Sequence, residues 1–180
     1  MVLGRTAAYY GLFQLAFAEA DEYLRTLLCH LRNPADPYRE FPSVSRMSLS
    51  RVLGDLRKKL RQFAKPPGTC LEENASHIRR ACACMRKLSV WRNSRIHPHA
   101  RTGMSGAYLL FDKRAGQDLS MDETEIMERI DDAINVSTVV ESNSAHLLDI
   151  LDFTQEIQAM LSQERTTDGE TLFAEHNRTL

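Results

Sequence analysis

Apolar residues recur along the first part of the chain with the spacing of an α-helix. Between about Gly4 and Arg32 they alternate at intervals of three and four residues, which places them on one helical face. These positions are Tyr10, Phe13, Phe17, Ala20, Leu24, Leu27 and Leu31. Asn33-Pro34 ends the predicted helix, because a residue before proline avoids the helical region. From residue 35 to residue 47 the spacing lapses around Pro37 and Pro42, and we predict a loop there.

Two further helices are predicted on the same grounds. Ser48 is placed to cap the second helix, whose apolar stripe is Leu49, Val52, Leu53, Leu56, Leu60 and Phe63. The run Lys65-Pro66-Pro67-Gly68 ends that helix. Thr69 and Glu72 form a capping box that opens the third helix, whose inward stripe reads Leu71, Ala75, Ile78, Cys82, Met85, Ser89, Arg92 and Ile96. Pro98 ends the third helix at or before His97.

The second half of the chain predicts an insertion and one long helix. Tyr108-Leu109-Leu110-Phe111 indicates a short hairpin or an apolar loop after the third helix. Ser120 with Glu123 is a second capping box, and the helical spacing that follows continues to Met160. A polar run over residues 141–144 is expected to kink or divide this helix. The polar, aperiodic residues 164–180 predict a flexible tail, so we expect one all-α domain, a bundle of four to five helices, over residues 1–163.

Size and composition agree with a single soluble domain. The chain has 180 residues, of which 43% are hydrophobic and 26% are charged. No apolar run approaches the roughly 20 residues that cross a bilayer, and we interpret the N-terminal segment as the first helix and not as a signal peptide. The four cysteines are expected to be reduced in a cytoplasm. Cys82 and Cys84 do not face each other on a helix, so we expect no metal there and interpret Cys82 as a buried apolar group.

Charge is distributed unevenly along the chain. Residues 46–101 contain 14 Lys or Arg against 3 Asp or Glu, whereas residues 118–175 contain 2 against 15. The basic block is able to attract a phosphate backbone. The alternative is that the basic helices pack beside the acidic helix, in the same or a second subunit, and the charges neutralise.

The stretch that carries chemistry is Trp91-Arg92-Asn93-Ser94-Arg95-Ile96-His97-Pro98-His99. Histidine titrates near neutral pH and can move a proton to or from a hydroxyl, and arginine holds a positive fork against a phosphate. Arg92 falls on the inward stripe of the third helix, where a charged side chain needs a partner, a cleft or a subunit interface. A helix break near His97 would let its ring turn back toward Arg92.

Arg92-Asn93-x-x-x-His97 resembles the signature of HEPN domains, which are small helical bundles and often dimers. Many HEPN proteins are metal-independent ribonucleases of toxin–antitoxin, abortive-infection and CRISPR systems. The resemblance implies that His97 is the general base or acid, that Arg92 binds the scissile phosphate and that Asn93 orients either the histidine or the scissile group. It also implies a homodimer with a composite site, an RNA substrate, an antitoxin or other protein partner, and no metal or other cofactor.

Other residues of the stretch carry weaker expectations. Arg95, Arg101 and His99 are candidates for contact with nucleic acid, and Trp91 is a candidate for stacking on a base. In one toxin branch of the family the position of His99 is a tyrosine that a partner enzyme modifies, and that regulation does not carry over.

Structural alternatives exist for the same residues. Arg92 could pair with an acid such as Glu19 or Glu22, His97 could be a cation at a helix end, and Trp91 could be packed. The alternative function is a non-catalytic dimeric binding or scaffold module that contacts RNA through its basic helices.

Overall fold

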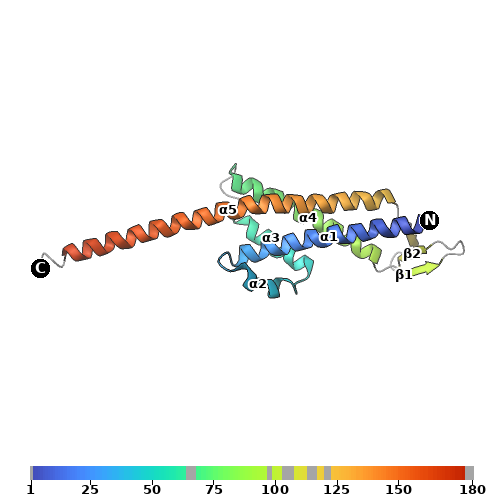
Figure 1. Cartoon of the computed structure of the whole chain (residues 1–180), viewed down its shortest axis with the longest axis horizontal. Coiled ribbons are helices and arrows are strands. Elements are labelled where there is room, and N and C mark those ends of the chain that lie inside the picture. Colours follow the sequence, from blue (N-terminus) through green and yellow to red (C-terminus); the bar gives the residue numbers. More distant parts are fainter. Residues whose placement is uncertain are drawn as a thin grey trace. The chain divides into compact units, whose positions relative to one another are not determined.

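The computed structural model describes residues 2–63, 68–96, 99–102, 108–112, 117–119 and 123–176. Within these residues five helices follow one another: α1 (Val2–Arg32), α2 (Pro37–Val44), α3 (Leu49–Arg61), α4 (Cys70–Ile96) and α5 (Glu123–His176). Three short strands lie between α4 and α5: β1 (His99–Thr102), β2 (Tyr108–Asp112) and β3 (Gln117–Leu119) (Figure 1). The prediction of an all-α bundle of four to five helices is confirmed.

The chain divides into two compact units inside α5. The first unit comprises Met1–Ser144 and the second comprises Ala145–Leu180. The division falls at the end of the polar run at which the sequence predicts the last helix to kink or divide. The sequence predicts a flexible tail over residues 164–180. The backbone of α5 is instead helical as far as His176.

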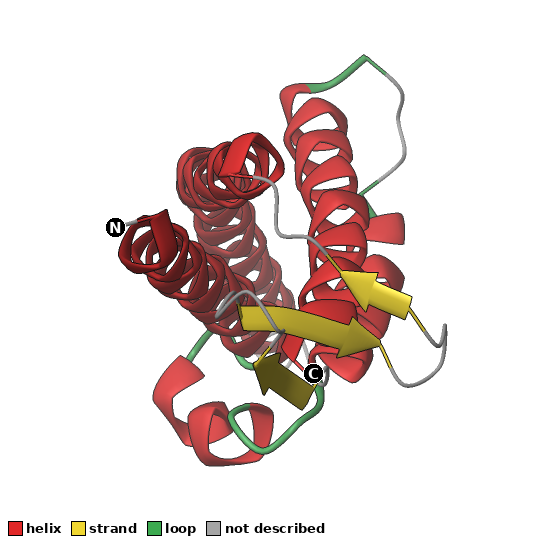
Figure 2. Ribbon diagram, turned by 90° about the vertical axis from the view of Figure 1, so that its right-hand side faces the viewer, coloured by secondary structure: helices red, strands yellow, loops and turns green. Residues whose placement is uncertain are grey.

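In the first unit α1, α4 and the first part of α5 contact one another. The Phe13 and Trp91 rings join α1 to α4, with centroids 4.9 Å apart. Thr6 donates a hydrogen bond to Glu123 Oε1 (3.2 Å), which joins the starts of α1 and α5. Figure 2 shows α1 and the start of α5 nearly end on, with the strands in front of the helices. The contacts place α4 antiparallel to α1 and α5 parallel to it.

The core of the bundle is formed by the apolar stripes that the sequence predicts. α1 contributes Phe13, Phe17, Ala20, Leu24, Leu27 and Leu31, all buried. α3 contributes Val52, Leu53, Leu56 and Leu60, and α4 contributes Ala75, Ile78, Cys82 and Met85. The first part of α5 adds Ile126, Ile130, Ala133, Val136 and Val140. Burial of these side chains is the main contribution that holds the helices together, at about 1.5–3 kcal/mol for each large one.

The predicted loop over residues 35–47 is wrong, because α2 lies within it. Asp36 caps α2, its side chain accepting a hydrogen bond from the Arg39 N–H, and Pro37 occupies the first helical position. Proline is favoured at that position because its missing N–H would have no helical partner there. Arg25 of α1 then holds the other end of α2: Arg25 Nη1 donates to the carbonyl oxygens of Val44 (2.8 Å) and Met47 (3.0 Å).

The remaining helix starts follow the sequence prediction. Ser48 caps α3, its hydroxyl accepting a hydrogen bond from the Arg51 N–H. The Thr69 hydroxyl accepts one from the Glu72 N–H (3.2 Å) at the start of α4. Gly68 precedes this cap with φ of 78°, a conformation that glycine adopts without steric cost. The Ser120 cap predicted for α5 lies outside the described residues.

The insertion after α4 is a small antiparallel sheet of order β1-β2-β3. His99 pairs with Phe111 and Arg101 with Leu109 in the register of β1 and β2. β3 adds to the other edge of β2, with Leu119 opposite Leu110. Of the two predicted alternatives, a hairpin or a loop, the described backbone has the hairpin, formed by β2 and β3, and β1 adds a third strand to it.

Candidate functional site

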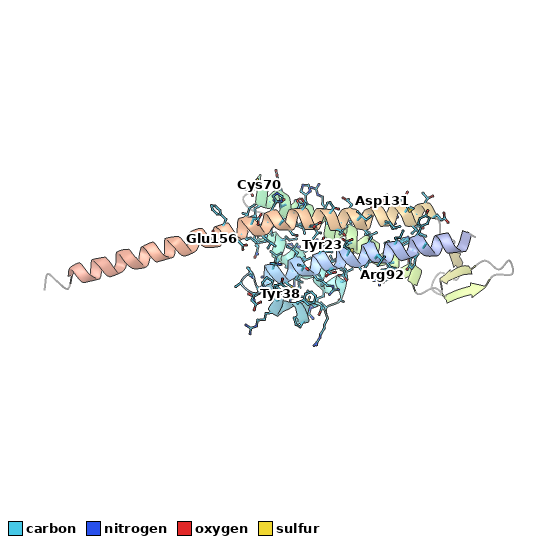
Figure 3. All side chains as sticks on the ribbon, viewed as in Figure 1. Tyr23, Tyr38, Cys70, Arg92, Asp131 and Glu156 are labelled. Atoms are coloured by element: carbon cyan, nitrogen blue, oxygen red, sulfur yellow. The ribbon has the colours of Figure 1, made fainter. Side chains whose placement is uncertain are left out.

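Arg92 lies near the end of α4 and points at α1 (Figure 3). Arg92 Nε donates a hydrogen bond to Gln14 Oε1 (3.0 Å), and its guanidinium carbon lies 4.7 Å from the centroid of the Phe17 ring. The side chain is half-buried. The prediction that Arg92 belongs to the inward face of its helix is therefore confirmed.

The structural alternative for Arg92, a salt bridge to an acid such as Glu19 or Glu22, is absent among the described residues. Glu19 and Glu22 are exposed on α1, and within the described part of the chain no carboxylate forms an ion pair with Arg92. Both contacts of the guanidinium are to uncharged groups, an amide oxygen and an aromatic face. The Gln14 amide and the Phe17 ring hold the guanidinium in place without neutralising its charge. The positive charge therefore stays available to an anion.

Two more polar groups lie beside Arg92 on α1. The Tyr10 hydroxyl and Gln14 Nε2 are buried and form no hydrogen bond of good geometry with any described residue. Burial raises the pKa of Tyr10, while the Gln14 amide and the Arg92 charge lower it by smaller amounts. Tyr10, Gln14 and Arg92 thus form a polar cluster at the α1–α4 contact. Sequence reasoning missed Gln14, although it lies one helical turn after Tyr10 and beside the inward stripe.

Trp91 is packed where α1, α4 and α5 meet. Its Nε1–H donates to Glu125 Oε1 (2.6 Å), and its ring meets the Phe13 ring edge-on at 77°. The Tyr10 ring lies 6.4 Å away. These contacts agree with the alternative that Trp91 is a packed residue, and they leave its ring engaged with neighbouring side chains instead of offered to a base.

The other predicted site residues are placed only in part. Asn93 is exposed on α4, directly after Arg92, and Arg95 belongs to the last turn of the same helix. His99 and Arg101 lie on β1, two residues apart. His97 lies outside the described residues, between the end of α4 at Ile96 and the start of β1.

The basic block is largely unpaired. Among the described residues of α3, α4 and the turn before α3, Arg79 pairs with Glu72 (Nη2 to Oε1, 3.7 Å). Besides Arg92, the cations of α3, α4 and the turn before α3 that form no ion pair with a described residue are Arg46, Arg51, Arg57, Lys58, Lys59, Arg61, Arg80, Arg86 and Lys87. Within the described residues α4 packs beside α5, but no ion pair joins these cations to the acidic helix. Neutralisation against a second subunit stays a prediction.

The cysteines behave as apolar or surface groups. Cys82 is buried, and burial raises the pKa of its thiol to about 12, although Arg57 and Arg86 act to lower it. Burial also raises the pKa of Cys84, and Asp132 adds to that effect. The interpretation of Cys82 as a small core residue is confirmed. A thiol with so high a pKa is a poor nucleophile near neutral pH.

The described residues contain no cluster of three or more His, Cys, Asp or Glu side chains arranged to hold a metal ion. Nor is any helix among them both long and apolar enough to cross a bilayer.

Comparison of the chain with protein-family models, with curated proteins and with solved structures found no match. The resemblance to HEPN domains therefore depends on the Arg92-Asn93-x-x-x-His97 motif and on the helical bundle that carries it.

Proposed function

We propose that the protein is a HEPN-type endoribonuclease that cuts RNA without a metal ion. The observation that carries the proposal is the state of Arg92. Its guanidinium is fixed between Gln14 and the Phe17 ring, and no described carboxylate neutralises it. A fixed, half-buried and uncompensated cation stabilises a phosphate that gains charge in a transition state better than a mobile surface arginine does.

The proposed reaction uses the ribose of the substrate as nucleophile. The His97 imidazole takes the proton of a 2′-hydroxyl, and the oxygen attacks the adjoining phosphorus. The bond from phosphorus to the 5′-oxygen breaks, and this oxygen takes a proton from an imidazolium. The products are a 2′,3′-cyclic phosphate and a 5′-hydroxyl. Arg92 holds the non-bridging oxygens, and Asn93 orients the scissile group.

The sequence contains one copy of the motif, so we further propose a homodimer in which two copies form a composite site. A second copy supplies a second histidine, which lets one imidazole act as base and the other as acid. A role in defence or stress, with an antitoxin or another protein partner, follows from the same resemblance. Analytical ultracentrifugation of the full chain measures the oligomeric state, and a monomer that still cleaves RNA contradicts the composite site.

The decisive experiment is RNA cleavage by the purified chain in the presence of EDTA. Arg92→Ala and His97→Ala are expected to lower the cleavage rate by about 10²-fold or more. Arg92→Lys keeps the charge and much of the stem but loses the fork, so it separates loss of phosphate binding from loss of packing on Phe17. Asn93→Ala is the complementary variant, because Asn93 is exposed and its loss leaves the bundle intact.

Two results would overturn the proposed site and mechanism. Cleavage by Arg92→Ala or His97→Ala at the wild-type rate would rule out the site assignment, and cleavage of an all-deoxy strand would rule out attack by a 2′-hydroxyl. Loss of all cleavage in EDTA would contradict the metal-free chemistry.

The second candidate is a non-catalytic dimeric module that binds RNA. The observation that favours it is that Arg92 also serves the fold, since it joins α4 to α1 through Gln14 and Phe17. The unpaired cations of α3 and α4 would then supply the affinity. Binding that weakens with salt, with no cleavage by the wild type, is the result that selects this function.

A further inference from the structure

Helix α2 exposes two aromatic side chains at its surface. Tyr38 is 88% exposed and Phe41 is 46% exposed. The helix itself is firmly placed, because Val44 is buried and Arg25 of α1 donates hydrogen bonds to the carbonyls at its carboxyl end. Two aromatic rings are therefore presented to solvent on a fixed support.

A cationic hollow lies between α1 and α3. Its volume is about 360 Å³, and it is lined by Leu28, Arg32, Asp55, Lys58, Lys59 and Gln62. Asp55 already compensates Arg32, with Oδ2 2.6 Å from Arg32 Nη2. Lys58 and Lys59 form no ion pair with any described residue, so the hollow has an excess of positive charge.

One side chain joins the hollow to α2. The Arg32 guanidinium contacts Asp55 on α3 and, through Nη1, Glu40 Oε2 on α2 at 3.6 Å. Tyr38 and Phe41 belong to the same short helix as Glu40. The exposed rings of α2 and the unpaired lysines of α3 therefore belong to neighbouring elements at one end of the bundle, where Figure 3 labels Tyr38.

We propose that this end of the bundle binds single-stranded RNA. Bases stack on Tyr38 and Phe41, and backbone phosphates bind Lys58 and Lys59 in the hollow. Exposed aromatic rings beside cations are the combination that single strands require, because unpaired bases offer π-faces and a phosphate accompanies each base. A helical groove of paired RNA would offer phosphates and 2′-hydroxyls, but no free base to stack.

The surface holds substrate and takes no part in the chemistry. Gln14, which binds Arg92, and Arg32 are 18 residues apart on α1, so the two places are separated by about 27 Å along the helix. The choice of RNA over single-stranded DNA rests on the proposed nuclease function, and it identifies the substrate of that site as an unpaired strand.

The experiment measures binding of a fluorescent 2′-O-methyl oligouridine by anisotropy. The 2′-O-methyl group blocks the nucleophile, so the wild-type chain is used and the strand stays intact. Tyr38→Ala is expected to weaken binding about tenfold, and Tyr38→Ala with Phe41→Ala by about 100-fold. Tyr38→Phe keeps the ring and is expected to bind as the wild type does.

Matched variants separate this surface from general electrostatic attraction. Lys58→Gln with Lys59→Gln is expected to reduce the slope of log K against log salt by about 1.4, because each phosphate contact contributes about 0.7. Arg86→Gln with Lys87→Gln removes the same charge from exposed positions of α4 and is expected to change binding less. An abasic strand of equal length is expected to bind the wild type and the Tyr38→Ala, Phe41→Ala chain alike.

Three results overturn the inference. The first is unchanged oligouridine binding by Tyr38→Ala with Phe41→Ala. The second is an equal loss of oligouridine affinity for the α3 and the α4 charge variants, together with equal affinity of the wild type for oligouridine and for the abasic strand. The third is a double aromatic variant that changes from dimer to monomer while RNA binding stays constant, which would make α2 a contact between copies.

Failure of this inference differs from failure of the nuclease. Cleavage of ordinary RNA in EDTA tests Arg92 and His97, whereas binding of the 2′-O-methyl strand tests Tyr38, Phe41 and the lysines. A chain that cuts RNA but binds the strand equally well without its α2 rings keeps the nuclease and loses the surface. A chain that binds through α2 but never cuts keeps the surface alone.

Discussion

Replacement of Arg25 by alanine is expected to release α2 from the bundle. Arg25 Nη1 donates to the carbonyl oxygens of Val44 (2.8 Å) and Met47 (3.0 Å), and the side chain is 15% exposed. Hydrogen bonds from a charged donor contribute about 1.5–3 kcal/mol each. With the lower value for a partly exposed side chain, Arg25→Ala is expected to lower the free energy of unfolding by about 3 kcal/mol.

The control removes the other contact of the same side chain. Arg25 also pairs with Asp21 (Nε to Oδ1, 2.9 Å), one turn earlier on α1. Asp21→Ala breaks that pair but keeps the bonds to α2, so it is expected to cost about 0.5 kcal/mol. Urea unfolding followed by circular dichroism at neutral pH measures both variants. If Arg25→Ala is no less stable than Asp21→Ala, Arg25 does not hold α2 by these hydrogen bonds.

Further predictions concern a cap, a thiol and the Arg92 contact. Asp36→Ala removes the acceptor for the Arg39 N–H at the start of α2 and is expected to cost about 1 kcal/mol in a urea titration; an unchanged midpoint would contradict this. Because burial raises the pKa of Cys82 from 9.0 to about 12, its contribution to stability is full below pH 9 and is lost as pH rises toward 12. From about pH 8 to about pH 10 the free energy of unfolding is expected to fall by about 1.4 kcal/mol more in the wild type than in Cys82→Ala, and parallel pH curves would refute it. Gln14→Ala removes the acceptor of Arg92 Nε, so RNA cleavage is expected to fall about tenfold with the charge retained; Gln14→Glu, which adds a carboxylate to neutralise Arg92, is expected to lower cleavage further, and a faster Gln14→Glu enzyme would contradict the proposed role of free charge.

Much of the fold could be predicted because burial follows helical spacing. The stripes of α1, α3 and α4 name the side chains that are buried, and Ser48 and Thr69 mark helix starts that the hydrogen bonds bear out. Helix α2 could not be predicted in the same way. It has eight residues and two prolines, so its one buried position, Val44, gives no periodicity to detect. Its stability comes from Asp36, from Pro37 at the first position and from a long-range partner, Arg25.

The candidate site shows where reasoning from sequence reaches its limit. The inward placement of Arg92 follows from spacing alone and is confirmed. Its partners do not follow, because spacing gives the face of a residue but not which residue of a neighbouring helix meets it. Glu19 and Glu22 were attractive because of their charge, yet they lie on the exposed side of α1, whereas Gln14 and Phe17 lie on the side that meets α4. Whether His97 joins them remains a prediction.

The packing of Trp91 gives the protein a built-in optical reporter. Because the chain contains a single tryptophan, its indole emission arises from one place, the residue before Arg92. Its indole N–H donates a hydrogen bond to the Glu125 carboxylate. A phosphate bound at the neighbouring guanidinium is therefore expected to change the local electric field and, with it, the emission wavelength. A strand that binds only at α2 is expected to leave the Trp91 emission unchanged. Unlabelled protein can therefore tell occupancy of the motif from occupancy of the distant aromatic surface in a single titration.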